Sequence, residues 1–246
     1  HETTAQYALS PRLALSPTGS IHAAWPDPVQ IESIRWSSRP AGDATWTPSK
    51  FLATLPFELP DWQMRGGADG TLHFALRHWT HGFRSHRLEP EAGAWTDEAF
   101  IDDADPIAEV FDLAPQRDGG TQVLYLDADV DADATLRWRR SPVDSHAWTE
   151  ATHLNADASS IAEFRLAVDG HARAVAAWTY TEAPAIPALR LAHHENAWST
   201  SAPYLLLDHA GVSLRSLTSD VHGRMALALV DEAQAEVTIL MQADFE

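Results

Sequence analysis

The sequence contains no cysteine, and lysine occurs only once, at Lys50. The missing cysteine excludes disulfide bonds, thiolate zinc sites and cysteine nucleophiles. No uninterrupted apolar run reaches the ~18 residues needed to cross a bilayer, so we expect no membrane span. Acidic residues outnumber basic ones by 35 to 17, which gives a formal charge of −18. Such a field repels phosphates, and we therefore expect no nucleic-acid partner.

The start of the chain bears on its compartment. No signal peptide is visible, yet the sequence begins at His1 instead of methionine, which indicates a removed leader or a tag remnant. We favour a processed protein that is secreted or periplasmic. The preference for arginine over lysine, together with abundant alanine, points to a high-GC bacterial source.

A repeat with a period near 51 residues runs through the chain. A glycine-containing or similar turn leads into an apolar stretch five times: GSIHAAW from Gly19, GTLHFAL from Gly70, GTQVLYL from Gly120, ARAVAAW from Ala172 and GRMALAL from Gly223. A second marker, tryptophan followed by threonine or serine, occurs at Trp46, Trp95, Trp148 and Trp198. The intervals are 51, 50, 52 and 51 residues for the first marker and 49, 53 and 50 for the second. Two markers that share one period indicate a repeat architecture.

Each unit consists of four short runs separated by Gly, Pro, Asp and Asn turns, the pattern of antiparallel strands. The second run of every unit is apolar on both faces, so it must be covered from two sides. Radially packed four-stranded sheets provide this cover, because each sheet lies between two neighbours. The sequence therefore predicts an all-β, five-bladed β-propeller that forms a single domain over residues 1–246, with repeats at about 7–56, 57–107, 108–158, 159–209 and 210–246.

The repeat motifs resemble those of the bacterial sialidase-like propeller proteins. Units of that family carry an Asp or Gly turn, an apolar strand that ends in Trp, and a later Trp-Ser or Trp-Thr. The segments SPTGSIHAAW, GADGTLHFAL and AVDGHARAVAAW share the first part, and RPAGDATWTPS shares the second. The resemblance covers nearly the whole chain and implies a propeller fold. It implies no particular activity, because these motifs are structural and recur with many unrelated functions.

The last unit is shorter than the other four. It supplies three strands that end at Phe245, and its expected tryptophan marker would fall beyond Glu246. Residues 1–6 align with the end of a fourth strand. The sequence thus predicts a last blade that is either three-stranded or completed by the N-terminal segment.

The first strand of each unit carries polar residues at repeat-equivalent positions. In a propeller this strand lines the central channel, and alternate residues point to the same side. Arginine presents a fork that suits carboxylate groups, and acidic residues can orient a bound ligand. The predicted ligand-binding residues at these positions are Arg12, Asp61, Gln63, Asp112, Glu163, Arg165 and Arg215.

Three functions fit this constellation. In the first, which we favour, the residues bind one small carbohydrate-derived or carboxylate-bearing ligand at the mouth of the channel. In the second, Asp61, Asp112 and Glu163 are the catalytic carboxylates of a glycoside hydrolase, which needs two acids in different environments. In the third, the charges pair with one another and seal the channel of a structural or protein-interaction propeller. The arginines resemble the sialidase arginine cluster in kind, but no Tyr-Glu nucleophile pair is found.

Other potential ligands form weaker patterns, and we expect no cofactor. One loop presents alternate carboxylates that could hold calcium, although the Gly and distal Glu of an EF-hand are missing; a solvated acidic turn is the alternative. Its residues are Asp127, Asp129, Asp131 and Asp133. A histidine group lacks a matching fourth metal ligand, and its members are His78, His81 and His86. The tryptophan series is expected to pack between blades, with sugar stacking as the alternative.

Overall fold

The computed structural model describes residues 11–27, 30, 33–54, 61–78, 82–88, 95–96, 99–102, 110–127, 135–145, 147–154, 161–169, 171–182, 186–194, 198–200, 205–206, 212–219 and 224–241. Every helix or strand assigned in these residues is a β-strand, so the all-β prediction is confirmed. In this part of the chain, no helix is long and apolar enough to span a membrane.

The strands form five antiparallel sheets in chain order. Sheet 1 contains β1 (Arg12–Leu15), β2 (Ile21–Pro26), β3 (Ser33–Arg39) and β4 (Lys50–Thr54). Sheet 2 contains β5 (Asp61–Gly66), β6 (Leu72–His78), β7 (Gly82–Leu88) and β8 (Ala99–Asp102). Sheet 3 contains β9 (Phe111–Pro115), β10 (Thr121–Asp127), β11 (Thr135–Ser141) and β12 (Thr152–His153).

Sheet 4 contains β13 (Ile161–Val168), β14 (Ala174–Glu182), β15 (Ile186–His194) and β16 (Trp198–Thr200), and β17 (Leu205–Leu206) also pairs with β15. Sheet 5 contains β18 (Val212–Ser219), β19 (Met225–Asp231) and β20 (Glu236–Met241). Within the described residues sheet 5 is therefore three-stranded. The segment 1–6 that is predicted to complete it lies outside the described residues.

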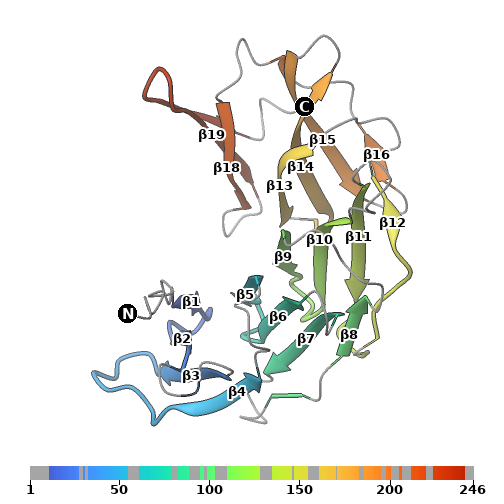
Figure 1. The fold of residues 1–246 in the computed structure, drawn as a ribbon. Coiled ribbons are helices and arrows are strands. Elements are labelled where there is room, and N and C mark those ends of the chain that lie inside the picture. The colour runs from blue at the N-terminus through green and yellow to red at the C-terminus, as the bar shows by residue number, and fades with distance from the viewer. Residues whose placement is uncertain are drawn as a thin grey trace, which may run out of the picture.

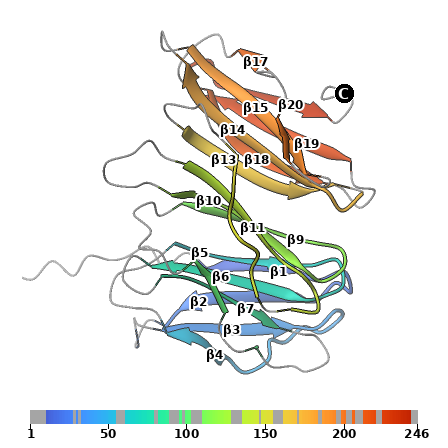
Figure 2. The same cartoon turned by 90° about the vertical axis from the view of Figure 1, so that its right-hand side faces the viewer.

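The sheets follow one another around an arc (Figure 1). Sheet 1 stands at one end of the arc, at the lower left, and sheet 5 stands at the other end, at the upper left. The first strands β1, β5, β9, β13 and β18 are neighbours in this order along the inside of the arc. The view turned by 90° (Figure 2) shows the sheets stacked from sheet 1 at the bottom to sheets 4 and 5 at the top.

Four apolar clusters fill the spaces between consecutive sheets. Aromatic and aliphatic side chains from both neighbours meet in each cluster: Trp36 and Phe74 between sheets 1 and 2, Phe83 and Tyr125 between sheets 2 and 3, Trp138 and Trp178 between sheets 3 and 4, and Leu189 and Leu227 between sheets 4 and 5. The described side chains of the second strands β6 and β14, and most of those of β10, are buried on both faces because a sheet lies on either side. At the ends of the arc, β2 and β19 are fully buried on one face only.

The turn between the first and second strands requires a positive φ angle. Gly19, Gly70 and Gly119 adopt φ values of +84°, +92° and +89° there, which glycine does without steric cost. In sheet 4 the corresponding residue is Ala172, with φ 62. The carboxylate of Asp169 stabilises this turn, because it accepts hydrogen bonds from two nearby backbone N–H groups.

The tryptophan markers connect each sheet to the third strand of the sheet before it. Trp95 lies edge-on to Trp36 of β3 at 5.7 Å between ring centroids. The indole N–H of Trp148 donates to Ser85 Oγ of β7 at 3.0 Å. In the same way, Trp198 lies edge-on to Trp138 of β11 at 5.4 Å. These three tryptophans therefore pack between sheets.

Trp46 differs from the other three, because sheet 1 is the first sheet in the part of the chain that the structure describes. Its side chain is 44% exposed, and the guanidinium of Arg39 lies 5.9 Å from the ring centroid. It lines an open apolar groove of about 560 Å³ together with Trp25. Among the described residues, Trp46 therefore has no third strand of a preceding sheet to pack against, unlike Trp95, Trp148 and Trp198.

Two phenylalanines of sheet 2 test how far stability depends on the packing between sheets. Phe83 is fully buried against Phe111, at 4.8 Å between ring centroids, whereas Phe100 is 55% exposed. We expect Phe83→Ala to lower the free energy of unfolding by about 3–5 kcal/mol through lost burial and a residual cavity. Phe100→Ala should cost less than about 1 kcal/mol. Urea titrations followed by tryptophan fluorescence measure both, and equal losses would contradict the packing described above.

Candidate functional site

Polar side chains on the first strands connect neighbouring sheets. Gln63 of β5 donates to the Phe111 carbonyl of β9 at 2.5 Å and accepts from the Leu113 N–H at 3.3 Å. The carboxylate of Glu163 on β13 accepts the Leu214 N–H of β18. Because the first strand is the inner edge of its sheet, its outward N–H groups need acceptors from elsewhere. Two of the predicted site residues thus satisfy the backbone of the next sheet.

Asp112 makes the same kind of contact from β9 and is buried. Its Oδ2 accepts the Leu166 N–H of β13 at 2.9 Å, and its Oδ1 accepts the Leu113 N–H at 3.0 Å. The guanidinium of Arg65 lies 3.3 Å from Oδ1. Burial raises the pKa of Asp112, while the Leu166 N–H and the charges of Arg65 and Arg165 act in the opposite direction. The carboxyl group is held from three sides at the junction of sheets 2, 3 and 4.

The arginines of β13 and β18 lie beside one another. Arg165 Nε donates to the Arg215 carbonyl at 3.0 Å, and its terminal nitrogen donates to the Phe164 carbonyl at 2.6 Å. The Arg215 guanidinium forms an ion pair with Glu232 and is 49% exposed. Among the described residues, no carboxylate lies within ion-pair distance of Arg165. Its guanidinium is bound to two carbonyl oxygens, and its charge acts on Asp112 from beyond ion-pair distance.

Two further arginines stand on the first strands of sheets 1 and 2. Arg12 is exposed, and its guanidinium lies 5.7 Å from the Trp62 ring centroid, a cation–π arrangement. Arg65 is missing from the sequence-based prediction, although it follows Gln63 by two residues and so lies on the same side of β5. The same period of two identifies it. We refer to Arg12, Arg65, Arg165 and Arg215 as the inner-strand arginines.

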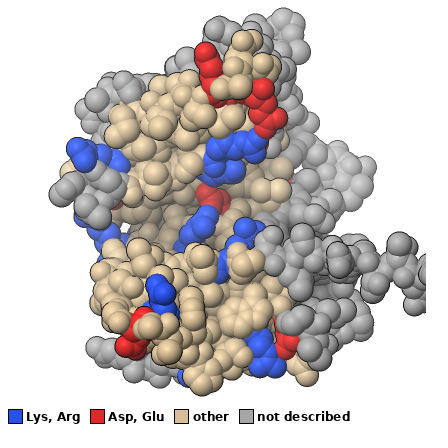
Figure 3. All heavy atoms as spheres, turned by 90° about the vertical axis from the view of Figure 1, so that its left-hand side faces the viewer, with Lys and Arg blue, Asp and Glu red and all other residues tan. Residues whose placement is uncertain are grey.

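A hollow opens on the side of the molecule that the arc leaves open. The space-filling view from that side (Figure 3) shows basic side chains around an acidic one in the hollow between the upper and lower parts of the molecule. The upper part contains sheet 5 and the lower part contains sheet 1. The surfaces that flank the hollow are mostly uncharged.

The predicted trio of catalytic carboxylates is only partly described. Asp61 begins β5, but its side chain lies outside the described residues. Asp112 and Glu163 both accept backbone N–H groups of the next sheet, as described above. A catalytic role for the three carboxylates stays a prediction.

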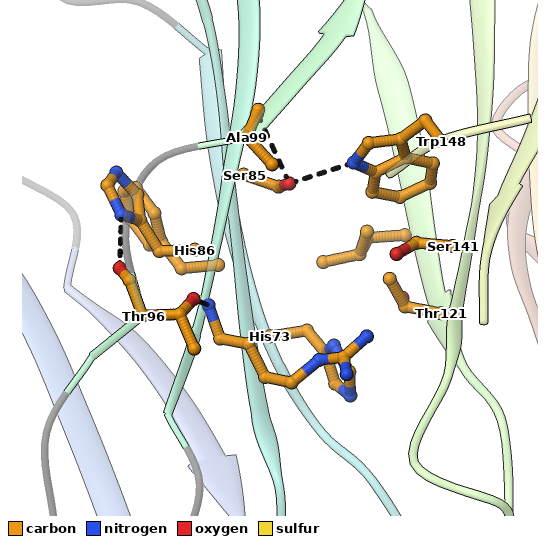
Figure 4. A pocket seen from close by; sticks show the side chains of 11 residues that line it. His73, Ser85, His86, Thr96, Ala99, Thr121, Ser141 and Trp148 are labelled. Atoms are coloured by element: carbon orange, nitrogen blue, oxygen red, sulfur yellow. Dashed lines mark hydrogen bonds between the residues drawn. The ribbon is translucent and has the colours of Figure 1, made fainter. Parts of the chain in front are cut away.

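A second, smaller site lies between sheets 2 and 3. This polar cavity of about 20 Å³ has room for one water molecule. Figure 4 shows side chains of both sheets around it, namely His73, Ser85, His86, Thr96, Thr121, Ser141 and Trp148. It is too small for a sugar, and we do not assign it a ligand.

His73 in the wall of this cavity is almost completely buried. Its Nε2 has no hydrogen-bond partner among the described residues. Burial, together with the positive charge of Arg87, lowers the pKa of His73 to about 3. The guanidinium of Arg87 is itself held by the carbonyls of Val143 and Pro142 at 2.7 and 3.2 Å. Both effects favour the neutral imidazole where the two sheets pack.

The candidate metal ligands are only partly described. Asp127 forms an ion pair with Arg137 at 2.5 Å, and His86 Nδ1 lies 3.3 Å from the Thr96 carbonyl oxygen. Asp129, Asp131, Asp133 and His81 and the side chain of His78 lie outside the described residues. Within the described ranges, no group of three or more His, Asp or Glu residues is arranged to hold a metal ion.

The contacts of Asp112 predict a cost for removing one acceptor oxygen. In the Asp112→Asn variant, an amide nitrogen replaces one carboxylate oxygen. In the unchanged protein, that oxygen accepts a backbone N–H or faces Arg65. We expect the free energy of unfolding to fall by roughly 1–3 kcal/mol. Asp43→Asn, in an exposed turn, is the control and should change stability by less than about 0.5 kcal/mol. Chemical denaturation at pH 7 compares the two, and a neutral Asp112→Asn would show that the contact between sheets is dispensable.

The buried imidazole predicts a pH dependence of stability. The folded-state pKa of His73, about 3, lies below its ordinary value of 6.5, so the unfolded chain binds the proton first. Stability from this group is complete above about pH 6.5 and decreases as the pH falls towards 3, by up to about 1.4 kcal/mol per pH unit.

Urea titrations at pH 7 and pH 5 test this dependence by comparing the protein with His73→Gln. The variant should lose about 2 kcal/mol less over that interval, since glutamine binds no proton. His22 and His194, whose pKa values burial also lowers, contribute equally to both proteins and cancel. His153→Gln, at an exposed position of β12, controls for the loss of a histidine. Parallel pH profiles of the protein and His73→Gln would refute the role given to His73.

Comparison with known proteins supports the fold. No family model and no curated protein matches the chain. A solved protein of unknown function from Dyadobacter fermentans is 13% identical with a TM-score of 0.60, over 95% of this chain and 78% of that one. An α-L-arabinanase from Penicillium chrysogenum is 11% identical with a TM-score of 0.53, over 95% of this chain and 80% of that one.

A variant of NanB sialidase from Streptococcus pneumoniae is 11% identical with a TM-score of 0.52, over 84% of this chain. The match covers 34% of the sialidase, so this chain corresponds to about a third of its length. At such identities the likeness concerns the fold alone. The predicted resemblance is confirmed at that level: the chain has the β-propeller fold found in sialidases and arabinanases.

Proposed function

We propose that this chain binds one small carboxylate-bearing ligand, derived from a carbohydrate, at the inner-strand arginines. The observation that carries the proposal is the set of four arginines on the first strands of sheets 1, 2, 4 and 5, of which Arg165 forms no ion pair among the described residues. The guanidinium fork suits a carboxylate and can bind it through two parallel hydrogen bonds.

The charge balance of the molecule supports this choice. The chain as a whole carries a formal charge of −18, whereas its five inner strands carry four arginines against three carboxylates. An overall negative field repels a free anion, so binding one requires a local cluster of positive groups. In the hollow, partial exclusion of water strengthens the attraction between arginine and an anion. The acceptors Asp112 and Glu163 hold the neighbouring sheets in place and so keep the arginines positioned.

The carbohydrate origin of the ligand rests on the structural neighbours. Their names describe a sialidase and an arabinanase complexed with arabinobiose, and both share the fold of this chain. We extend the proposal to the architecture: residues 1–246 form one domain of five blades, whose last blade is three-stranded or completed by residues 1–6. Hydrolysis of a glycoside remains the second candidate. It receives less support, because Asp112 and Glu163 both accept backbone hydrogen bonds.

Isothermal titration calorimetry with glucuronic acid, N-acetylneuraminic acid and glucose tests the proposal. We expect at least one of the two acids to bind, whereas glucose should not. Arg165→Gln and Arg215→Gln should each weaken that binding at least ~10-fold, because each removes a charged hydrogen-bond donor. Arg117→Gln, in the exposed turn after β9, is the matched control and should bind as the unchanged protein does.

Three results would contradict the proposal: no binding of either acid, equal binding of glucose, or full binding by both arginine variants. Assays with aryl glycosides of the same sugars address the hydrolase candidate separately. Turnover that disappears in Asp112→Asn or Glu163→Gln, with binding retained, would favour that candidate instead.

A further inference from the structure

The hairpin that joins β19 and β20 places a carboxylate on one of the inner-strand arginines. The Glu232 carboxylate, in the turn of this hairpin, forms an ion pair with the Arg215 guanidinium of β18. The hairpin stands at the end of sheet 5 where β18 begins, because Asp231 pairs with Val212. The connection between the second and third strands of sheet 5 therefore reaches the first strand of the same sheet.

A β-bulge in β18 sets Arg215 apart from its neighbours on the strand. The register with β19 shifts between Leu214 and Ser216, so Arg215 is left without a pairing partner in β19. Bulges re-aim side chains and are frequent next to active sites. The carbonyl of the bulged residue accepts the Nε–H of Arg165 at 3.0 Å. The bulge thus connects Arg215 with Arg165, and the contact of Glu232 lies within the proposed ligand site.

In the described part of the chain, two of the inner-strand arginines form ion pairs, and their two carboxylate partners are held differently. Asp112, beside Arg65, is buried and also accepts two backbone N–H groups. Glu232 is 67% exposed and its partner Arg215 is 49% exposed. Among the described residues, Arg215 is the only hydrogen-bond partner of the Glu232 carboxylate. Asp112 is therefore fixed, whereas Glu232 can leave its arginine without breaking another contact.

The backbone of the hairpin is held independently of the Glu232 side chain. The Asp231 carboxylate accepts the N–H groups of Ala233 and Gln234 at 2.9 and 3.1 Å. Ala235 completes the turn with a φ of 54°. The turn therefore presents Glu232 beside β18 without needing its carboxylate, and a substitution of Glu232 should leave the hairpin intact.

We propose that Glu232 is a built-in competitor of the ligand: its carboxylate occupies the Arg215 guanidinium in the unliganded protein, and the carboxylate of the ligand replaces it. This inference rests on the proposed function, since the exchange requires a carboxylate-bearing ligand at the inner-strand arginines. Both carboxylates form the same kind of charge-assisted hydrogen bond with the guanidinium. An exposed ion pair contributes little free energy, so the ligand displaces Glu232 at a small cost in affinity.

A carboxylate beside a ligand site could instead stay in place and accept a hydroxyl group of the ligand. Charge argues against this role for Glu232. If Glu232 remained on Arg215, its carboxylate and that of the ligand would share one guanidinium and repel each other at close range. Glu232 has no second contact among the described residues that would hold it there against this repulsion. Exchange of one carboxylate for the other avoids the conflict.

Calorimetric titration of the whole chain with glucuronic acid and N-acetylneuraminic acid measures the competition. Glu232→Gln keeps the size of the side chain and removes its charge. We expect this variant to bind the acid about 2- to 5-fold more tightly than the unchanged protein, the range that corresponds to loss of an exposed ion pair. Glu236→Gln removes the same charge from the start of β20 and should bind as the unchanged protein does. Circular dichroism shows whether each variant is folded.

A double-mutant cycle tests whether Glu232 acts through Arg215. In the Arg215→Gln background, Glu232→Gln should give no gain in affinity, because the guanidinium for which the two carboxylates compete is missing. An equal gain in both backgrounds would show that Glu232 acts only through its charge.

The occupancy of Arg215 is also measurable without a ligand. p-Hydroxyphenylglyoxal modifies arginines whose guanidinium nitrogens are accessible, and mass spectrometry of the peptides gives the rate at each position. We expect Arg215 to react roughly 2-fold faster, or more, in Glu232→Gln than in Glu236→Gln, because the first variant removes its ion pair. The rate at Arg117, in the turn after β9, should be the same in both variants.

Three results overturn the inference: equal modification of Arg215 in the two variants, acid binding by Glu232→Gln that is unchanged or weaker, or an equal gain with and without Arg215. Weaker binding would assign Glu232 the role of a hydroxyl acceptor instead. In each of these cases the unchanged protein still binds an acid, so the proposed function stands. If neither acid binds to any of the proteins, the proposed function fails, and the inference fails with it.

Discussion

Most of this structure depends on one constraint, that a sheet apolar on both faces must be covered on both. The second strands β6, β10 and β14 meet it, because apolar clusters fill the spaces on either side. Stacking sheets one after another is the solution the chain adopts, and the stack follows an arc. Among the described residues, one face of sheet 1 and one face of sheet 5 have no covering sheet.

A second requirement acts on the inside of the arc, where each first strand is a sheet edge. Its outward N–H groups must find acceptors, and Gln63, Asp112 and Glu163 provide them from the preceding sheet. Polar residues on these strands therefore have a structural task before any functional one. The inner-strand arginines exceed that task, since a guanidinium cannot accept an N–H. This surplus of donors is the feature on which our proposal of an anion site rests.

Polar groups between sheets also restrict the conditions under which the molecule is stable. At the interface of sheets 2 and 3, the Arg87 guanidinium donates to two carbonyl oxygens, while His73 Nε2 has no hydrogen-bond partner among the described residues. The neutral imidazole fits this place because a protonated ring would meet the arginine at close range. Packing between sheets and protonation are therefore coupled at this interface.

The sequence alone was sufficient for the all-β class and the period of the repeat, because turn residues and two-sided apolar strands are local signals. It also identified Asp112, Glu163 and Arg165 as polar inner-strand residues. Only the tertiary structure showed that the carboxylates of Asp112 and Glu163 accept N–H groups of the next sheet, since that contact joins residues about fifty positions apart. The exposure of Trp46 was likewise hidden in the sequence, where it looks like its packed equivalents Trp95, Trp148 and Trp198. Its environment depends on the position of its sheet in the arc, and no local pattern encodes that position.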